Sequence, residues 1–201
     1  SIVGLFLLLG GNGLVVWAEQ WVHSGIAALL IATSPLFMAL IELFIPGRPR
    51  IEFKGWLGLL IGFSGVVILV LSSSGVGNIN VKGAILLLVA SFLWAMGSVY
   101  SKSFKPAGSM IANIGIQMLT GGIALLILGI SLGELPRVSI SLKGIGALIY
   151  LIVFGSLLGY SSYIYVLGKW PAAKAGTYAY INPPVAVLLG TLILKEPFTL
   201  T

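Results

Sequence analysis

The chain has 201 residues, of which 58% are hydrophobic and only 8% are charged, and its mean hydropathy is +1.11. Because a water-soluble domain carries about 25% charged residues, this composition excludes a soluble globular domain and predicts an integral membrane protein. The net charge is +6 and no cysteine is present; dispersed basic residues argue against a nucleic-acid partner, and the lack of thiols excludes disulfides and thiol-bound metals.

Apolar runs of about 20 residues, the length of helix that crosses a bilayer, recur along the whole chain. They are too continuously apolar for the strands of a transmembrane barrel. We therefore predict an all-α integral membrane protein, a multi-span helical bundle. The expected spans are 1–18, 24–45, 55–72, 84–102, 109–132, 144–167 and 174–195.

The loops between these spans differ in basic charge. Those after the second, fourth and sixth spans hold seven Lys and Arg residues, and the opposite side holds four. The positive-inside rule therefore places the first set in the cytoplasm. Four of the five tryptophans lie at span edges, as expected of interfacial anchors, whereas Trp94 lies near the middle of the fourth span.

Polar and aromatic side chains inside the spans are the candidate binding residues, because an unpaired polar group in hydrocarbon costs a few kcal/mol. Some of them share a helix face, since Asn113 and Gln117 are four residues apart. For each residue, ligand contact and hydrogen bonding or packing between helices remain alternatives. The candidates for substrate binding are Asn12, Ser34, Trp94, Asn113, Gln117, Tyr160, Tyr178 and Asn182.

An internal repeat links the two ends of the chain. The segment "TSPLFMALIELFIPGRP" aligns without a gap with "INPPVAVLLGTLILKEP", so that Pro35 pairs with Pro183 and Pro49 with Pro197, both 148 positions apart. The second copy begins five spans after the first, an odd number, so the two copies must cross the membrane in opposite directions. Inverted repeats with broken helices at matching places are typical of secondary transporters that bind substrate near the midplane. Kinking for packing is the alternative explanation of the prolines.

The sequence resembles the EamA-type transporters of the drug/metabolite transporter superfamily. The similarity rests on "AEQWVHSGIAALLIATSPLFMALIELF", "KGWLGLLIGFSGVVILV", "ASFLWAMGSVYSK" and "AAKAGTYAYINPPVAVLLGTLILKEP". The resemblance implies ten helices in two inverted five-helix repeats. This chain would supply seven of them, with residues 1–72 as the end of the first repeat and 73–201 as the second repeat without its last helix. Glu196 keeps the acidic turn of the family motif, whereas Arg48 replaces it in the first half.

We therefore expect a secondary transporter of small organic metabolites, a permease or exporter in the inner membrane, with no cofactor and no metal. Its expected partners are the lipid bilayer, a small-molecule substrate and, through small-residue helix faces, a second copy in a homodimer. Proton coupling and passive exchange both stay open, because no carboxylate lies plainly at a midplane. The alternatives are a membrane-embedded enzyme, which lacks a recognisable catalytic set, and a channel or scaffold, which lacks a repeated filter.

Overall fold

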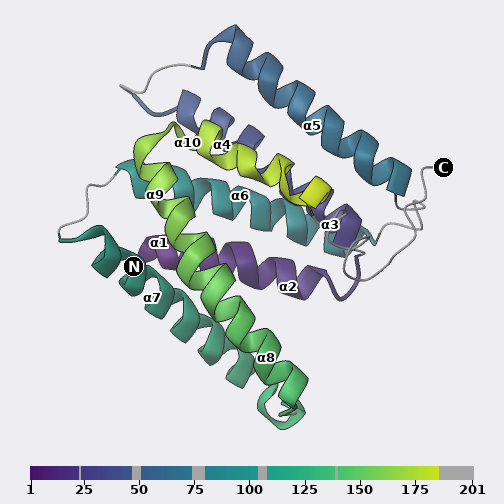
Figure 1. Ribbon diagram of the computed structural model, residues 1–201, viewed down its shortest axis with the longest axis vertical. Coiled ribbons are helices and arrows are strands. Elements are labelled where there is room, and N and C mark those ends of the chain that lie inside the picture. The colour runs from purple at the N-terminus through teal and green to yellow at the C-terminus, as the bar shows by residue number, and fades with distance from the viewer. Residues whose placement is uncertain (23, 47–50, 74–79, 104–107, 139, 186–201) are drawn as a thin grey trace.

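The computed structural model describes every residue except 23, 47–50, 74–79, 104–107, 139 and 186–201. The described chain forms helices and no strand (Figure 1). In chain order the elements are α1 (Ile2–Gly4), the π-helical η1 (Leu5–Gly13), α2 (Leu14–Ala18), α3 (Ser24–Ile31), α4 (Ser34–Leu43), α5 (Phe53–Ser73), α6 (Val81–Ser103), α7 (Met110–Ser131), the 3₁₀ turn η2 (Leu135–Arg137), α8 (Leu142–Tyr150), the π-helical η3 (Leu151–Tyr160), α9 (Ser161–Lys169), α10 (Ala172–Gly176) and the 3₁₀ turn η4 (Thr177–Tyr180).

Several of these helices have the length and composition of membrane spans. Within the described part of the chain, four are long and apolar enough to cross a bilayer, namely Ile26–Leu43, Val81–Ser103, Met110–Ser131 and Leu142–Lys169. Two shorter apolar helices, Ile2–Ala18 and Phe53–Ile68, coincide with the first and third predicted spans. The prediction of an all-α membrane fold is confirmed. The seventh predicted span, 174–195, lies partly outside the described residues.

Helix α6 lies at the centre of the arrangement. It contacts the first helix (α1, η1 and α2), the second helix (α3 and α4), α9 and α10. Figure 1 shows α5 at one edge, followed by α4 and α10, then α6, and then the first helix beside α7. The buried residues of α6 include Ala90, Ser91, Ala95 and Ser98, so small side chains let its neighbours approach closely. Helix α6 is therefore the element that most of the other described helices contact.

The second helix is broken where the sequence predicts it. Residues 32 and 33 form a turn and α4 begins at Ser34, with Pro35 in its first turn. Proline is tolerated there because the first N–H groups of a helix lack intrahelical partners. In the other half, Ile181 is a turn residue and residues 182–185 are helical. Both helices thus restart at the same point of the 148-residue repeat.

Two further irregularities fall at nearly matching places. The π-helical segments η1 and η3 interrupt the first and sixth helices, and shifting η1 by 148 positions gives 153–161, within two residues of η3. A π turn is rare in an α-helix and frequently marks a functional position. The inverted orientation of the halves and their division at residues 72 and 73 stay predictions.

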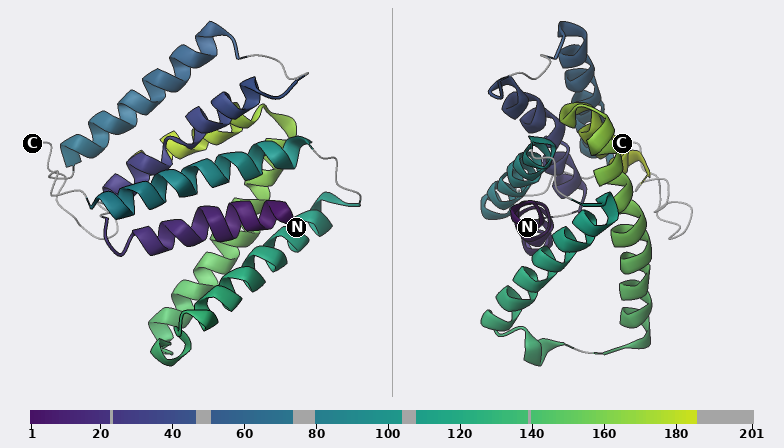
Figure 2. Two further views of the ribbon diagram at one scale, coloured as in Figure 1. Left: turned by 180° about the vertical axis from the view of Figure 1, so that it is seen from behind. Right: turned by 90° about the vertical axis from the view of Figure 1, so that its left-hand side faces the viewer.

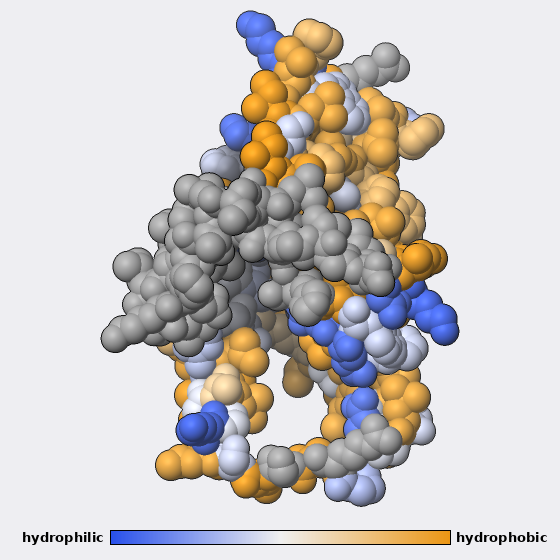
Figure 3. Space-filling view, turned by 90° about the vertical axis from the view of Figure 1, so that its right-hand side faces the viewer, coloured by the Kyte–Doolittle hydropathy of each residue, from blue (hydrophilic) through white to orange (hydrophobic). Residues whose placement is uncertain are grey.

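The sixth helix extends away from the rest of the bundle. The right-hand view of Figure 2 shows α7 and α8 farthest apart at the end where the chain passes from one to the other. Gly133, which follows α7, has a φ of 70°. Residues 142–159 are all exposed. Figure 3 shows an opening between these helices and apolar side chains over much of the visible face. Such apolar surface is stable in hydrocarbon or against further protein rather than in water.

The glycines of α5 do not all face the same surroundings. A Cβ at Gly62 would lie 2.6 Å from the ring of Tyr180, so this position packs against the seventh helix. A Cβ at Gly58 or Gly65 would meet no atom within 4 Å. The homodimer through a small-residue face therefore stays a prediction.

The charge count gives a topology that labelling can test. If the connection after the sixth span, residues 169–172, lies in the cytoplasm, a single cysteine replacing the exposed Gly168 should be shielded from an impermeant thiol reagent in intact cells. A cysteine replacing Gln20, which is exposed after α2, should label readily. Both variants should label equally after the membrane is permeabilised. The reverse pattern in intact cells would refute the orientation.

Candidate functional site

A cluster of three hydroxyl groups lies at the break in the second helix. Thr33 Oγ1 donates to the carbonyl of Leu30 at 2.5 Å, and Ser34 Oγ donates to the carbonyl of Ile31 at 2.8 Å. From α6, Ser91 Oγ lies 2.9 Å from Thr33 Oγ1, 2.7 Å from Ser34 Oγ and 3.3 Å from the Ile31 carbonyl. Pro35 has no N–H to donate to the carbonyl of Ile31, and the Ser34 hydroxyl supplies a donor in its place. The Leu30 carbonyl accepts from the Thr33 N–H at 3.2 Å as well as from the Thr33 hydroxyl.

An aromatic and hydroxyl network lies further along α6. The Trp94 Nε1 group donates to Tyr163 OH at 3.2 Å, and Ser98 Oγ donates to the Trp94 carbonyl at 2.7 Å. Because the single Ser98 proton is used there, the 2.5 Å contact between Ser98 Oγ and Tyr163 OH must carry the tyrosine proton. The three residues form a closed ring of hydrogen bonds. Polar groups inside a bundle are stable in such a network because each is satisfied.

Tyr178 completes this aromatic cluster, and Gly11 of the first helix packs against it. A Cβ at Gly11 would lie 2.7 Å from the Trp94 ring, so only a glycine there lets the first helix approach the indole. The Trp94 and Tyr163 ring centroids are 5.3 Å apart, and those of Tyr163 and Tyr178 are 5.2 Å apart in an edge-on arrangement. These are the separations at which aromatic rings attract one another. We call Trp94, Ser98, Tyr163 and Tyr178 the aromatic cluster.

A second buried pair lies nearby on the same helix as Tyr163. Tyr160 OH donates to Gln117 Oε1 at 2.8 Å, and both side chains are buried. This bond joins α7 to the end of η3, just as Tyr163 joins α6 to α9. Tyr160, Tyr163, Ile164 and Leu167 form the buried face of this helix. Two of the predicted candidates, Gln117 and Tyr160, are therefore brought into direct contact.

The structure places the other predicted site residues in several different surroundings. Trp94 and Tyr178 belong to the aromatic cluster, and Ser34 belongs to the hydroxyl cluster at the helix break. The Asn113 side-chain amide donates to the Ser109 carbonyl at 2.9 Å, within its own helix. Asn12 and Asn182 are exposed. Substrate contact by any of these residues stays a prediction.

Two residues outside the predicted site set make the longest-range contacts. Tyr163 joins Trp94, Ser98 and Tyr178. Glu42, near the end of α4, is buried at 8% exposure against the start of α10. No local pattern signals the contacts to Ser98 or to α10, because those partners are 65 to 131 residues away in the sequence.

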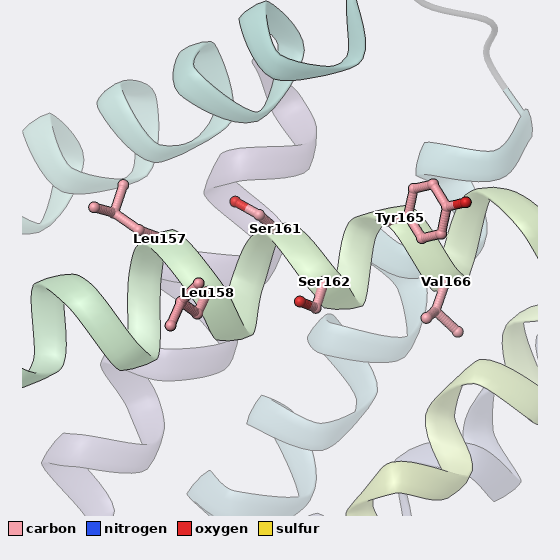
Figure 4. A pocket seen from close by; sticks show the side chains of 6 residues that line it. All are labelled: Leu157, Leu158, Ser161, Ser162, Tyr165 and Val166. Atoms are coloured by element: carbon pink, nitrogen blue, oxygen red, sulfur yellow. The ribbon is translucent and has the colours of Figure 1, made fainter.

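A pocket of about 520 Å³ lies on the face of the sixth helix opposite Tyr160 and Tyr163, and Figure 4 shows the side chains that line it. Six residues line it, and all of them come from this helix: Leu157, Leu158, Ser161, Ser162, Tyr165 and Val166. The buried tyrosines Tyr160 and Tyr163 lie on the opposite face, so the pocket and the aromatic cluster are separate. Among the described residues, no group of three His, Cys, Asp or Glu side chains could hold a metal ion.

Comparison with known proteins gives a consistent family. The EamA-like transporter family matches residues 1–71 and 81–201. The chain is 43% identical over 194 residues to the uncharacterized inner membrane transporter YedA of Escherichia coli strain K12, an alignment that covers 95% of this chain and 61% of YedA. It is 29% identical over 205 residues to an uncharacterized transporter of Archaeoglobus fulgidus, covering 100% of this chain and 67% of that protein.

A Bacillus subtilis protein, the uncharacterized transporter YvbV, is 26% identical over 189 residues, covering 94% of this chain and 61% of YvbV. One solved structure, titled only as the crystal structure of a protein, superposes with a TM-score of 0.77 at 19% identity and covers 97% of this chain and 67% of that chain. At this identity the match shows the fold alone. The chain spans about three fifths of the length of YedA and YvbV.

Proposed function

Because this chain belongs to the EamA-like transporter family and is a multi-pass protein of the cell membrane, we propose that it is part of a secondary transporter of small organic metabolites. The observation that carries this proposal is the aromatic cluster. Trp94, Tyr163 and Tyr178 come from α6, α9 and η4, and α6 contacts both helices that carry a break, the second through α3 and α4 and the seventh through α10. Sites between broken helices of inverted repeats are where secondary transporters bind their substrates.

The chemistry of the cluster suggests the class of solute. The indole and phenol rings offer apolar faces, while Ser98, Gln117 and Tyr160 offer hydroxyl and amide groups within the same interior. An amphipathic metabolite with an apolar or aromatic part and a few hydrogen-bonding groups fits such a lining. The hydrogen bonds of the closed network would exchange one by one for bonds to the solute. Because exchange of satisfied bonds costs little, occupancy by a solute is compatible with this packing.

An enzyme and a channel are the competing functions, and neither is supported by a specific observation. We propose that the protein is not an enzyme, since the described carboxylates do not gather into a catalytic set and the family and its relatives carry transporter names. Alternating access, in which the site opens to each side in turn, differs from a channel because it links the two directions of movement.

Counterflow in liposomes tests the function directly. The complete protein would be purified and reconstituted into vesicles preloaded with one unlabelled compound from a panel of amino acids, nucleosides and sugars. For a substrate, the same compound added outside in labelled form should accumulate transiently above its equilibrium level. Equilibration without this overshoot would indicate a channel, and chemical conversion of the compound would indicate an enzyme. No uptake of any compound above empty vesicles would oppose the proposal.

A further inference from the structure

Glu42 is a buried carboxylate that joins the two halves of the chain. It lies near the end of α4 and is 8% exposed. Its Oε1 accepts a hydrogen bond from the Ala172 N–H at 3.0 Å, and its Oε2 accepts one from the Ala173 N–H at 3.4 Å. The first N–H groups of a helix lack partners within that helix and carry partial positive charge, so a carboxylate is a favourable acceptor there. Charge-assisted bonds of this kind are stronger than neutral ones.

The surface behind this contact is closely packed. Pro35, Met38 and Ala39 are buried on the face of α4 that carries Glu42. Opposite them, α10 presents small buried residues, and a Cβ at Gly176 would lie 2.7 Å from Met38 Sδ and 3.4 Å from Pro35 Cα. The two backbones therefore approach as closely as small-residue interfaces allow. Helix α4 belongs to the first half of the repeat and α10 to the second.

The connection before α10 is also tied to its own half. Lys102, at the end of α6, donates to the carbonyl of Trp170, which ends α9. A cation at the carboxyl end of a helix is electrostatically favourable. Residues 169–172 are thus attached to α6, within their own half, through Lys102. From the other half, the Glu42 carboxylate accepts hydrogen bonds from the backbone at the end of this connection.

In the second half of the repeat, the position that corresponds to Glu42 is not a carboxylate. A shift of 148 positions pairs Glu42 with Gly190, and pairs Ala172 and Ala173 with Ser24 and Gly25. Inverted repeats give two related arrangements, one closing each side, whose relative stability depends on where the halves differ in sequence. A carboxylate present in only one of them stabilises that arrangement selectively.

We propose that Glu42 is a positioning residue of the transport cycle: its carboxylate holds α4 against α10, keeps that side of the transporter closed, and must leave the α10 N–H groups for the side to open. This inference rests on the proposed alternating access. The charge count predicts that the closed side is the cytoplasmic one. The chemical event is the exchange of two carboxylate hydrogen bonds for bonds to water, and no covalent step is involved.

Thiol labelling of the complete protein in detergent tests this role without a known substrate. A cysteine replacing the buried Ala39, in a background without other cysteines, reports opening between α4 and α10. Replacing Glu42 by Gln should raise the labelling rate by about tenfold, the change expected from losing one charge-assisted hydrogen bond. Glu42→Asp, which keeps the charge and shortens the reach, should give a smaller increase and serves if the Gln variant does not fold. The matched control is Glu52→Gln, an exposed carboxylate before α5, which should leave the rate unchanged.

The outcomes separate this role from a purely structural one. If Glu42→Gln lowers the thermal midpoint but leaves the labelling rate of the cysteine at position 39 unchanged, Glu42 only caps α10 and the proposal is overturned. An equal increase from Glu52→Gln would overturn it as well. If Glu42→Gln speeds labelling but the protein shows no counterflow with any compound, the role of Glu42 in closing this interface stands and the transport proposal is the one that fails.

Discussion

Replacing Gly121 by Ala should lower the stability of the folded protein by about 1–3 kcal/mol, the usual cost of forcing extra volume into a packed interior. A Cβ at this position of α7 would lie 2.5 Å from the Leu8 Cβ and 2.8 Å from the Gly4 carbonyl oxygen. The first helix and α7 could accommodate it only by moving apart. We expect a lower thermal midpoint in detergent and a smaller monodisperse fraction in size-exclusion chromatography.

The next residue provides a matched control. A Cβ at Gly122 would meet no atom within 4 Å, and alanine favours a helix over glycine by up to about 1 kcal/mol. Gly122→Ala should therefore leave the midpoint unchanged or raise it slightly. Equal midpoints for the two variants would contradict the close approach of the first helix to α7.

Trp94→Ala in the complete protein should keep membrane expression and reduce the initial rate of counterflow by at least about tenfold. If the indole binds the solute, its removal costs the solute one aromatic contact and one hydrogen bond, which together exceed about 1.4 kcal/mol. The indole contacts Tyr163 through both its ring and its N–H group. Trp94→Phe keeps a ring and loses the donor, so its rate should lie between those of the wild type and the Ala variant.

Controls separate binding from folding. Trp17 is exposed and pairs with Trp21 at a centroid distance of 5.8 Å, so Trp17→Ala should transport normally. Wild-type transport by Trp94→Ala at matched expression would show that the aromatic cluster is structural. Asn182→Ala tests the other predicted region, beside the second helix break, and loss of transport there with normal transport in Trp94→Ala would move the site to that break.

Local sequence patterns predict much of this fold. Hydropathy alone locates the helices, because no soluble surface could tolerate such apolar runs. The prolines locate both helix restarts, since proline removes a helical donor wherever it occurs. The spacing of Ser91, Trp94 and Ser98, at three and four residues, is that of one helix face, and in the structure Ser91 and Ser98 are both buried.

Long-range contacts could not be predicted in the same way. The sequence identifies Tyr163 as aromatic but not that it meets Ser98, because that depends on how α9 crosses α6. Glu42 lies close enough to the end of its helix to reach water, and only the position of α10 explains why it is buried. Asn12 shows the converse: a polar residue within a span predicts an interior position, yet its side chain is exposed.

Counting protons at the break between α3 and α4 shows why this point can bend without leaving a polar group unpaired. Thr33 and Ser34 use their protons on the carbonyls of Leu30 and Ile31, which leaves Ser91 with one proton and three oxygen atoms within 3.3 Å. A hydroxyl rotates freely about its C–O bond and donates to only one acceptor at a time. Ser91 can therefore change acceptors as α4 tilts, so that bending at the break leaves no hydroxyl proton without an acceptor. What opposes bending is then the packing of α4 against α6 and α10 and the Glu42 contact, not the hydrogen bonds of the break itself.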